Sequence, residues 1–412
     1  MRRAPALLLL ASFAFAATPL AEYRVRRDAL RGKIRDGVLI LFGATESSGR
    51  HRSAFFQESN FYYLTGWREP GAILVLTPQT EILFLPRRNP EQERWTGPRT
   101  DPASPEAKRR SGFEKILPAE SFEASLPEIV EDGAKIYTLL RAGYAEKLKA
   151  LLPLRRFADA GPLIAGLRAK KSPSEIGLLR RAVDVTIDAH RAAWRRLAPG
   201  LFEYQLAAAM AAVYLDAGCG RPAYAPIVGS GPNALVLHYS EKSRRMDAGE
   251  LVLMDVGAEC GRYAADLTRT LPVSGRFSKR QRELYEIVLG AQRAAIAAVK
   301  PGMTLAREGP ASLYQIACEY FDRYHNARGE GLCQYFTHNI GHHVGLDVHD
   351  PVPRTTPLEP GMVITIEPGL YIPEENIGIR IEDMVLVTED GGEVLSDALP
   401  KEPDAVQALI GR

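Results

Sequence analysis

Short apolar runs separated by turn residues dominate the first part of the chain. Residues 37–43, 72–77 and 81–86 are rich in Val, Ile, Leu and Phe, which predicts buried strands. Apolar residues at helical spacing over 144–152 predict a helix. The polar stretch 87–110 is rich in Pro, Arg and Glu, which predicts a long loop. This alternation is typical of a small α/β domain.

Trp95 lies within the predicted loop. An exposed Trp on a long loop often marks a contact surface, here with another subunit, so we expect a homo-oligomer. The alternative is that Trp95 packs locally as an anchor for the loop. The sequence does not choose between the two.

A strong helix start marks the domain boundary. Ser172 and Glu175 form a capping box with Pro173 between them, so a long helix is expected from this point. We therefore expect an N-terminal α/β domain over 17–169 and a second domain over 170–412. Paired helices interrupted by Pro-Gly are then predicted twice, at 173–197 and 203–217, and again at 279–299 and toward 324. This recurrence indicates a weak internal duplication, in which each half contributes part of one site.

The first 16 residues have the features of a secretory signal peptide. Two arginines precede an apolar run from Ala6 to Phe15, and Ala14-Phe-Ala16 is a cleavage motif. The apolar run is too short to span a bilayer comfortably. We therefore expect an exported protein, periplasmic or secreted, with no stable membrane span after processing.

Charge and cysteine content narrow the function classes. Cleavage after Ala16 would change the balance from 52 basic and 50 acidic residues to 50 of each, and no basic patch indicates nucleic-acid binding.

Four cysteines lie in the C-terminal half, and export permits disulfides, but the spacing selects none of the three pairings. For Cys260 we expect a buried thiol.

Acidic residues interrupt runs that otherwise have the composition of buried strands. These residues are Asp255, Asp266, Glu367 and Glu382. A carboxylate in an apolar run is costly unless it is paired or binds a cation. Four of the eight histidines fall close together, at His338, His342, His343 and His349. Four carboxylates and one histidine are therefore expected to hold metal.

The ligand set indicates the kind of metal centre. Oxygen-rich ligands favour Mn, Fe or Co over a thiolate zinc site, and no His-Glu-x-x-His motif occurs. Four carboxylates exceed what one ion needs, so two bridged ions are expected, which can hold a hydroxide between them and act on a carbonyl. Singly, each acid is as well explained as a strand-end or ion-paired carboxylate.

Six sequence motifs lie in the first domain and around the candidate site residues: Phe56-Gln-Glu-Ser-Asn-Phe-Tyr-Tyr-Leu-Thr-Gly66, Met254-Asp-Val-Gly, Ala265-Asp-Leu-Thr-Arg, Gly341-His-His-Val-Gly-Leu-Asp-Val-His-Asp, Gly361-Met-Val-Ile-Thr-Ile-Glu-Pro-Gly-Leu-Tyr and Ile379-Arg-Ile-Glu-Asp. Together and in this order, these motifs resemble those of the pita-bread metallopeptidases of the aminopeptidase P and prolidase family. The first belongs to the N-terminal domain, which methionine aminopeptidases normally lack. The resemblance implies an α/β N-terminal domain plus an α+β pita-bread (creatinase/aminopeptidase-like) catalytic domain.

The resemblance also implies the metal ligands. Asp255 and Asp266 would hold one ion, and Asp266 and Glu382 would bridge to the second. His342 and Glu367 would complete the second site. In the family, the glutamate at the position of Glu367 also moves protons between nucleophile and leaving amine. The family typically uses manganese, whereas the residue types alone also allow cobalt, iron or zinc.

The same resemblance implies substrate-binding residues. His238 and His349 would bind and polarise the scissile region, and His338 would line the pocket. Arg380 would contact substrate or support a metal ligand; a structural ion pair is the alternative. The remaining histidines are expected to be structural or exposed: His51, His190, His325 and His343.

Three functions remain open at this stage. The first is an aminopeptidase that releases the residue before proline through a metal-bridging hydroxide. The second is a prolidase restricted to Xaa-Pro dipeptides. The third is a non-catalytic pita-bread protein that binds a peptide or another partner, which the complete ligand set disfavours. Because an Xaa-Pro bond is a tertiary amide with restricted φ, it resists most peptidases.

Overall fold

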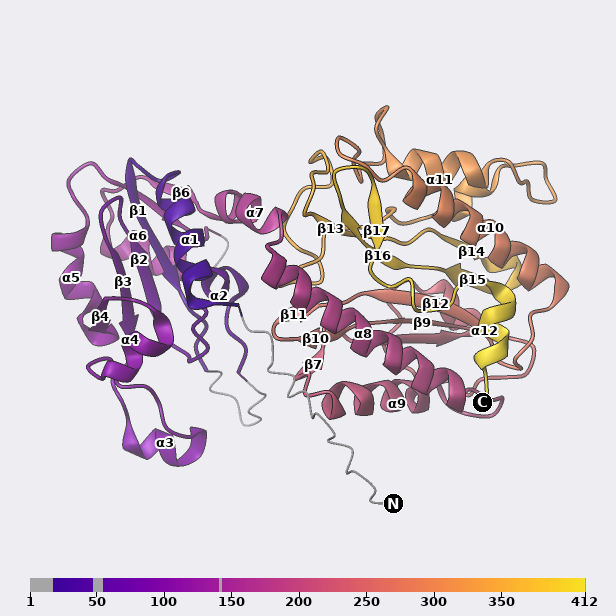
Figure 1. Ribbon diagram of the computed structural model, residues 1–412, viewed down its shortest axis with the longest axis horizontal. Coiled ribbons are helices and arrows are strands. Elements are labelled where there is room, and N and C mark those ends of the chain that lie inside the picture. The colour runs from indigo at the N-terminus through magenta and orange to yellow at the C-terminus, as the bar shows by residue number, and fades with distance from the viewer. Residues whose placement is uncertain (1–17, 47–54, 141–142, 412) are drawn as a thin grey trace, which may run out of the picture.

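The structure is a computed structural model that describes residues 18–46, 55–140 and 143–411. The expected signal peptide at 1–16 lies outside the described residues. Figure 1 shows an N-terminal domain and a larger C-terminal domain, with α7 (Gly161–Ala169) between them. Among the helices that the structure describes, none is long and apolar enough to cross a membrane.

The N-terminal domain is built on one six-stranded sheet in the order β4-β3-β2-β1-β5-β6. The pairs β1–β2 and β2–β3 are antiparallel, and the outer pairs are parallel. The strands are β1 Gly37–Phe42, β2 Ile73–Leu76, β3 Glu81–Leu85, β4 Lys115–Pro118, β5 Lys135–Thr138 and β6 Phe157–Asp159. The three strands predicted from apolar runs are confirmed as β1, β2 and β3.

Both faces of this sheet are buried. Successive side chains of a strand point to opposite faces, and all six residues of β1 are buried. Leu39 and Leu41 share a core cluster with Phe61, whereas Val38 and Ile40 belong to a second core cluster. The domain's helices cover the two faces (Figure 1). They are α1 Leu20–Arg31, α2 Ser59–Thr65, α5 Phe122–Ile129, α6 Tyr144–Leu151 and α7, with a 3-10 turn at Ala119–Ser121.

The predicted loop at 87–110 is wrong in part, because it contains two short helices. They are α3 Pro90–Thr96 and α4 Pro105–Ser111. Asn89 and Ser104 cap them, each followed by proline at the first helical position. Trp95 on α3 is 82% exposed, which excludes a role as a local packing anchor.

Helix α8 begins at the predicted capping box, in which the Ser172 and Glu175 side chains bond each other's backbone. The predicted helix pairs are confirmed as α8 Pro173–Arg196 with α9 Glu203–Asp216, and α10 Lys279–Ala297 with α11 Leu313–Phe321. A last helix, α12, spans Pro403–Leu409. In Figure 1 the strands lie between the two helix pairs. The repeated order agrees with the internal duplication inferred from sequence.

Four small antiparallel sheets fill the space between the helices, in the orders β12-β9-β8, β11-β10-β7, β13-β16-β17 and β14-β15. The strands are β7 Arg221–Pro222, β8 Ile227–Ser230, β9 Leu251–Val256, β10 Ala258–Cys260, β11 Tyr263–Ala264, β12 Leu267–Pro272, β13 Val363–Ile366, β14 Gly369–Ile372, β15 Ile377–Arg380, β16 Asp383–Val387 and β17 Gly392–Val394. An isolated bridge between Thr268 and Glu382 connects the two halves. This junction lies beside the candidate metal ligands.

The expectation of a buried thiol at Cys260 is wrong. Cys260 forms a disulfide with Cys219, and Cys318 pairs with Cys333. Strand β10 pairs with β7, which begins two residues after Cys219, and this pairing brings the first two cysteines to a Cα–Cα distance of 4.6 Å. Sequence spacing contains no information about this strand pairing, so it selected no disulfide.

We expect removal of the Cys219–Cys260 disulfide by serine substitution to destabilise the catalytic domain by about 2–4 kcal/mol. The bond closes a loop with a sequence separation of 41, against 15 for Cys318–Cys333. The matched removal of the shorter loop should therefore cost about 1 kcal/mol less. Denaturant unfolding of the two serine pairs checks this order, and equal stability of both variants and the parent would contradict it.

Candidate metal centre

The five expected metal ligands come from strand ends in both halves of the catalytic domain. Asp255 lies in β9 and Asp266 immediately precedes β12, so one hairpin carries both. Glu367 directly follows β13, and Glu382 lies between β15 and β16. His342 lies in the long segment before β13. Its carbonyl oxygen accepts a hydrogen bond from the Thr365 backbone N–H, and its own N–H donates to Thr365 Oγ1.

Two glycines permit the close backbone approaches that gather these ligands. A Cβ atom at Gly257 would lie 1.7 Å from the Ala265 carbonyl oxygen, and one at Gly341 would lie 2.0 Å from the Thr365 carbonyl oxygen. Any other residue would push the Asp266 strand or His342 away. The glycines next to Asp255 and His342 in the sequence motifs therefore have a steric cause.

All five ligand candidates line one cavity of about 260 Å³. Asp266, His342 and Glu382 form a possible metal-binding group, with one ligand atom from each within 4.8 Å of the others. His342 Nε2 lies 3.3 Å from Asp266 Oδ2 and 3.8 Å from Glu367 Oε1. The cavity is also lined by His238, His349, Tyr224, Ala225, Ile227, Ser240 and Val348.

The carboxylates at the cavity are crowded, and their pKa values reflect it. Burial, followed by repulsion from neighbouring acids, raises the pKa of Asp266 and places that of Glu382 well above its usual value. Burial likewise raises the pKa of Glu367 to about 7. Burial is the largest effect on Asp255 and opposes its ionisation, but the charge of Arg380 and the hydrogen bonds from Tyr224 and Arg380 together lower the pKa. If all four carboxylates were ionised, their negative charge would therefore exceed what the neighbouring cationic side chains balance.

These contacts fit divalent metal better than they fit a metal-free core. His342 Nδ1 lies 3.2 Å from the His343 carbonyl oxygen, and donation there leaves Nε2 free to accept. Nε2 then faces the Asp266 carboxylate at 3.3 Å, so two acceptors meet unless a proton or a cation lies between them. Carboxylate oxygens with one imidazole nitrogen suit hard or borderline divalent ions.

Tyr224 is a site residue that the sequence analysis missed. Its hydroxyl oxygen lies 2.5 Å from Asp255 Oδ1 and also hydrogen-bonds to Asp266 Oδ1. The hydroxyl has a single proton, which the two carboxylates must share. Tyr224 follows the two-residue strand β7 in a loop without periodicity, so the sequence contained no signal for it.

We expect Tyr224→Phe to weaken metal binding by about 10- to 100-fold, because partners that orient ligands typically have effects of that size. The aromatic ring remains, so the cavity wall is kept and only the hydroxyl is lost. Metal titration of the apo protein measures this directly. An unchanged affinity would show that the hydroxyl does not orient Asp255 and Asp266.

Two expected substrate residues lie behind the cavity wall rather than on it. Arg380 donates to Asp255 Oδ2 at 2.5 Å and to the Tyr371 hydroxyl at 2.5 Å. His338 Nε2 is 2.9 Å from the same hydroxyl. Arg380 therefore forms an ion pair with a candidate metal ligand, a contact that fits both the expected support of a ligand and the alternative of a structural ion pair. Neither Arg380 nor His338 is among the residues lining the cavity.

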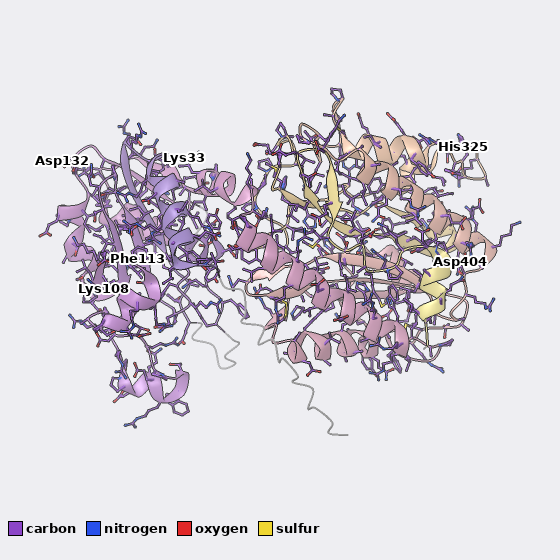
Figure 2. All side chains as sticks on the ribbon, viewed as in Figure 1. Lys33, Lys108, Phe113, Asp132, His325 and Asp404 are labelled. Carbon is purple, nitrogen blue, oxygen red and sulfur yellow. A yellow bond between two sulfur atoms is a disulfide. The ribbon has the colours of Figure 1, made fainter. Side chains whose placement is uncertain are left out.

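The other histidines fall into distinct environments. His238 and His349 are exposed at the cavity, and the His349 ring centroid lies 4.2 Å from that of His342. His190 is buried and lies 3.1 Å from the Leu267 carbonyl oxygen. His343 is buried, with no hydrogen-bond partner for its ring among the described residues. His325 lies at the far edge of the domain (Figure 2), and His51 is outside the described residues.

The sequence matches two family models, one in each domain. Residues 177–389 match metallopeptidase family M24, and residues 23–137 match the aminopeptidase P N-terminal domain. The first match covers more than half of the chain. The chain belongs to metallopeptidase family M24. This M24 enzyme has the pita-bread fold expected from its motifs, and the family assignment supports divalent metal as its cofactor.

Similar proteins span nearly the whole M24 chain. An Xaa-Pro aminopeptidase of Haemophilus influenzae is 34% identical, with 95% of this chain and 97% of the relative covered. One of Escherichia coli is 35% identical, covering 94% and 97%. The structure of aminopeptidase P from E. coli with the inhibitor Pro-Leu has a TM-score of 0.86 at 32% identity, covering 95% of this chain and 98% of that one.

Proposed function

We propose that this metallopeptidase hydrolyses the bond between the N-terminal residue of a peptide and a proline at the second position. The proposal is carried by one observation: a complete set of five ligand-type side chains lines one cavity, in a chain similar to Xaa-Pro aminopeptidases over almost its full length. The complete set also disfavours a non-catalytic binding protein.

The roles of the site residues follow from their positions. Asp255, Asp266, His342, Glu367 and Glu382 would hold two divalent ions. When bound, these ions supply Lewis-acid activation of the peptide carbonyl and of the attacking water. Glu367 lines the cavity. It would accept a proton from the attacking water and pass it to the proline nitrogen, because a tertiary amide nitrogen must be protonated before it can leave.

The imidazoles of His238 and His349 are exposed and line the cavity, which supports a contact with the peptide there. We assign them the orientation of the scissile carbonyl. Arg380 and His338 would act from behind the wall through Asp255 and Tyr371. A direct contact of Arg380 or His338 with substrate would require a rearrangement of this hydrogen-bonded group.

A panel of proline peptides tests the substrate class. We expect Xaa-Pro-Xaa tripeptides and longer peptides to be cleaved after the first residue, with kcat/KM at least comparable to that for Xaa-Pro dipeptides. Matched peptides with alanine in place of proline should be poor substrates. Hydrolysis confined to dipeptides would replace this function by that of a prolidase, and no hydrolysis with two metals bound would favour a binding protein.

We further propose manganese as the metal. The oxygen-rich ligand set favours hard ions, although cobalt, iron and zinc have acceptable ligands here too. The apo enzyme reconstituted with each ion in turn tests this choice. Highest kcat/KM with manganese is expected, and a clear preference for another ion would overturn the assignment.

We propose that the protein is exported and processed after Ala16. The two disulfides support this proposal, because such bonds persist in oxidising compartments. N-terminal sequencing of protein from native cells should find a start at or within a residue or two of Ala17. An intact Met1 on cytosolic protein would refute export.

We also propose a homo-oligomer that buries Trp95. The molar mass of the parent and of Trp95→Ala, measured by light scattering, can test this proposal.

A further inference from the structure

Arg168 links three segments of the chain next to the candidate site. It lies on α7, and its side chain is only 2% exposed. One terminal nitrogen donates to Asn60 Oδ1 at 2.9 Å. The other lies 2.7 Å from Asp347 Oδ2 and 2.6 Å from Asp350 Oδ1. The guanidinium therefore ties the N-terminal domain to two aspartates of the catalytic domain.

The two aspartates flank the cavity residues Val348 and His349. Asp347 also accepts a hydrogen bond of 2.6 Å from Ser59 at the start of α2. Asp350 is fully buried and has a second cation, Lys171, at 3.3 Å. Both ends of this four-residue turn are therefore held by groups from α2, α7 and the linker to α8.

The turn is held tightly from inside as well. The Asp350 backbone N–H donates to the His343 carbonyl at 2.9 Å, and the Gly345 N–H donates to the Asp347 carbonyl at 3.0 Å. A Cβ atom at Gly345 would lie 2.6 Å from Asp350 Oδ2. In contrast, the structure gives the His349 imidazole a ring contact with His342 and no hydrogen bond among the described residues. The position of His349 thus depends on the turn that carries it.

We propose that Arg168 is a positioning residue that fixes His349 at the cavity through Asp347 and Asp350. The activity part of this inference rests on the proposed function; the placement of His349 does not. The proposal gives the N-terminal domain a part in catalysis, because Asn60 and Ser59 complete the same group of contacts. A planar guanidinium can reach three acceptors at fixed angles, whereas a lysine ammonium acts as a point charge.

Two variants and one control test the placement without any substrate. The metal-loaded protein is carbethoxylated, and the rate of modification of His349 is measured by peptide mass spectrometry. This rate reports how well the position of His349 is held. His349 is already exposed at the cavity, so its rate reports the surroundings in which the turn holds the imidazole. We expect the rate to change several-fold in Arg168→Lys and, to a smaller extent, in Ser59→Ala, because the loosened turn no longer holds the ring in one place. Exposed His325 is the internal reference. Arg27→Ala removes an equally buried arginine that binds Glu81 in the N-terminal domain, and it should leave the His349 rate unchanged.

A double-mutant cycle tests the connection to turnover. Arg168→Lys should lower kcat by about 10- to 100-fold at full metal content, as expected for a misplaced catalytic group. In a His349→Ala background the same substitution should have little further effect, because the two act through one side chain. Arg27→Ala should lower thermal stability but keep kcat.

The outcomes separate the two proposals. An unchanged His349 modification rate in Arg168→Lys would overturn the positioning role, and so would independent, multiplying effects of the two substitutions on kcat. If the parent enzyme cleaves no proline peptide, the proposed function fails, and the modification rates alone decide the role of Arg168. Loss of metal from Arg168→Lys would also overturn the proposal, because it would place the effect on the ligands instead of His349.

Discussion

Replacing Asp266 by alanine is expected to remove most of the metal binding and to lower kcat/KM at least about a thousandfold, since Lewis-acid stabilisation contributes several kcal/mol. Asp266 belongs to the group with His342 and Glu382, and it shares the Tyr224 hydroxyl with Asp255. A carboxylate between two ions serves both, so its loss should not leave one ion bound normally. Glu382→Ala should behave in the same way.

Metal analysis after saturation measures this effect, with about two ions per chain expected in the parent. Asp404→Ala is the matched control, because Asp404 lies at the surface on α12 and pairs with Arg282 (Figure 2). That variant should keep both ions and full activity. Retention of two tightly bound ions by Asp266→Ala would show that Asp266 is not a bridging ligand.

Much of the fold was predictable because local sequence determined it. The strands β1 to β3 are short apolar runs between turn residues, and Ser172 with Glu175 defines the start of α8. The helices α3 and α4 also had local signals, since Asn89 and Ser104 each precede a proline. Polar composition outweighed these caps in the prediction of one long loop.

The features missed in the site depend on contacts between distant segments. Tyr224 meets Asp255 and Asp266 across 31 and 42 residues, and no periodicity marks it. Cys219 meets Cys260 only because β7 and β10 pair. The carboxylates themselves were found because a charge in an apolar run needs an explanation even before the fold is known.

The two neighbouring histidines at the cavity should respond differently to alanine substitution. His342 points its Nε2 at Asp266 and Glu367, so His342→Ala should lose metal together with activity. His349 contacts the His342 ring and lines the cavity. His349→Ala should therefore keep both ions and lower kcat by about 100-fold, the range of an orienting or proton-transferring side chain.

The comparison of His342→Ala with His349→Ala is informative because each variant removes one imidazole, and the two rings are neighbours in the cavity. His325→Ala, at the far edge of the domain, controls for the loss of an imidazole as such. Metal content and kcat are measured on the same preparations. If His349→Ala emptied the site, His349 would be a ligand and not a substrate contact. If it kept full turnover, the peptide would be oriented by His238 alone on that wall, and the turn held by Arg168 would have no catalytic part.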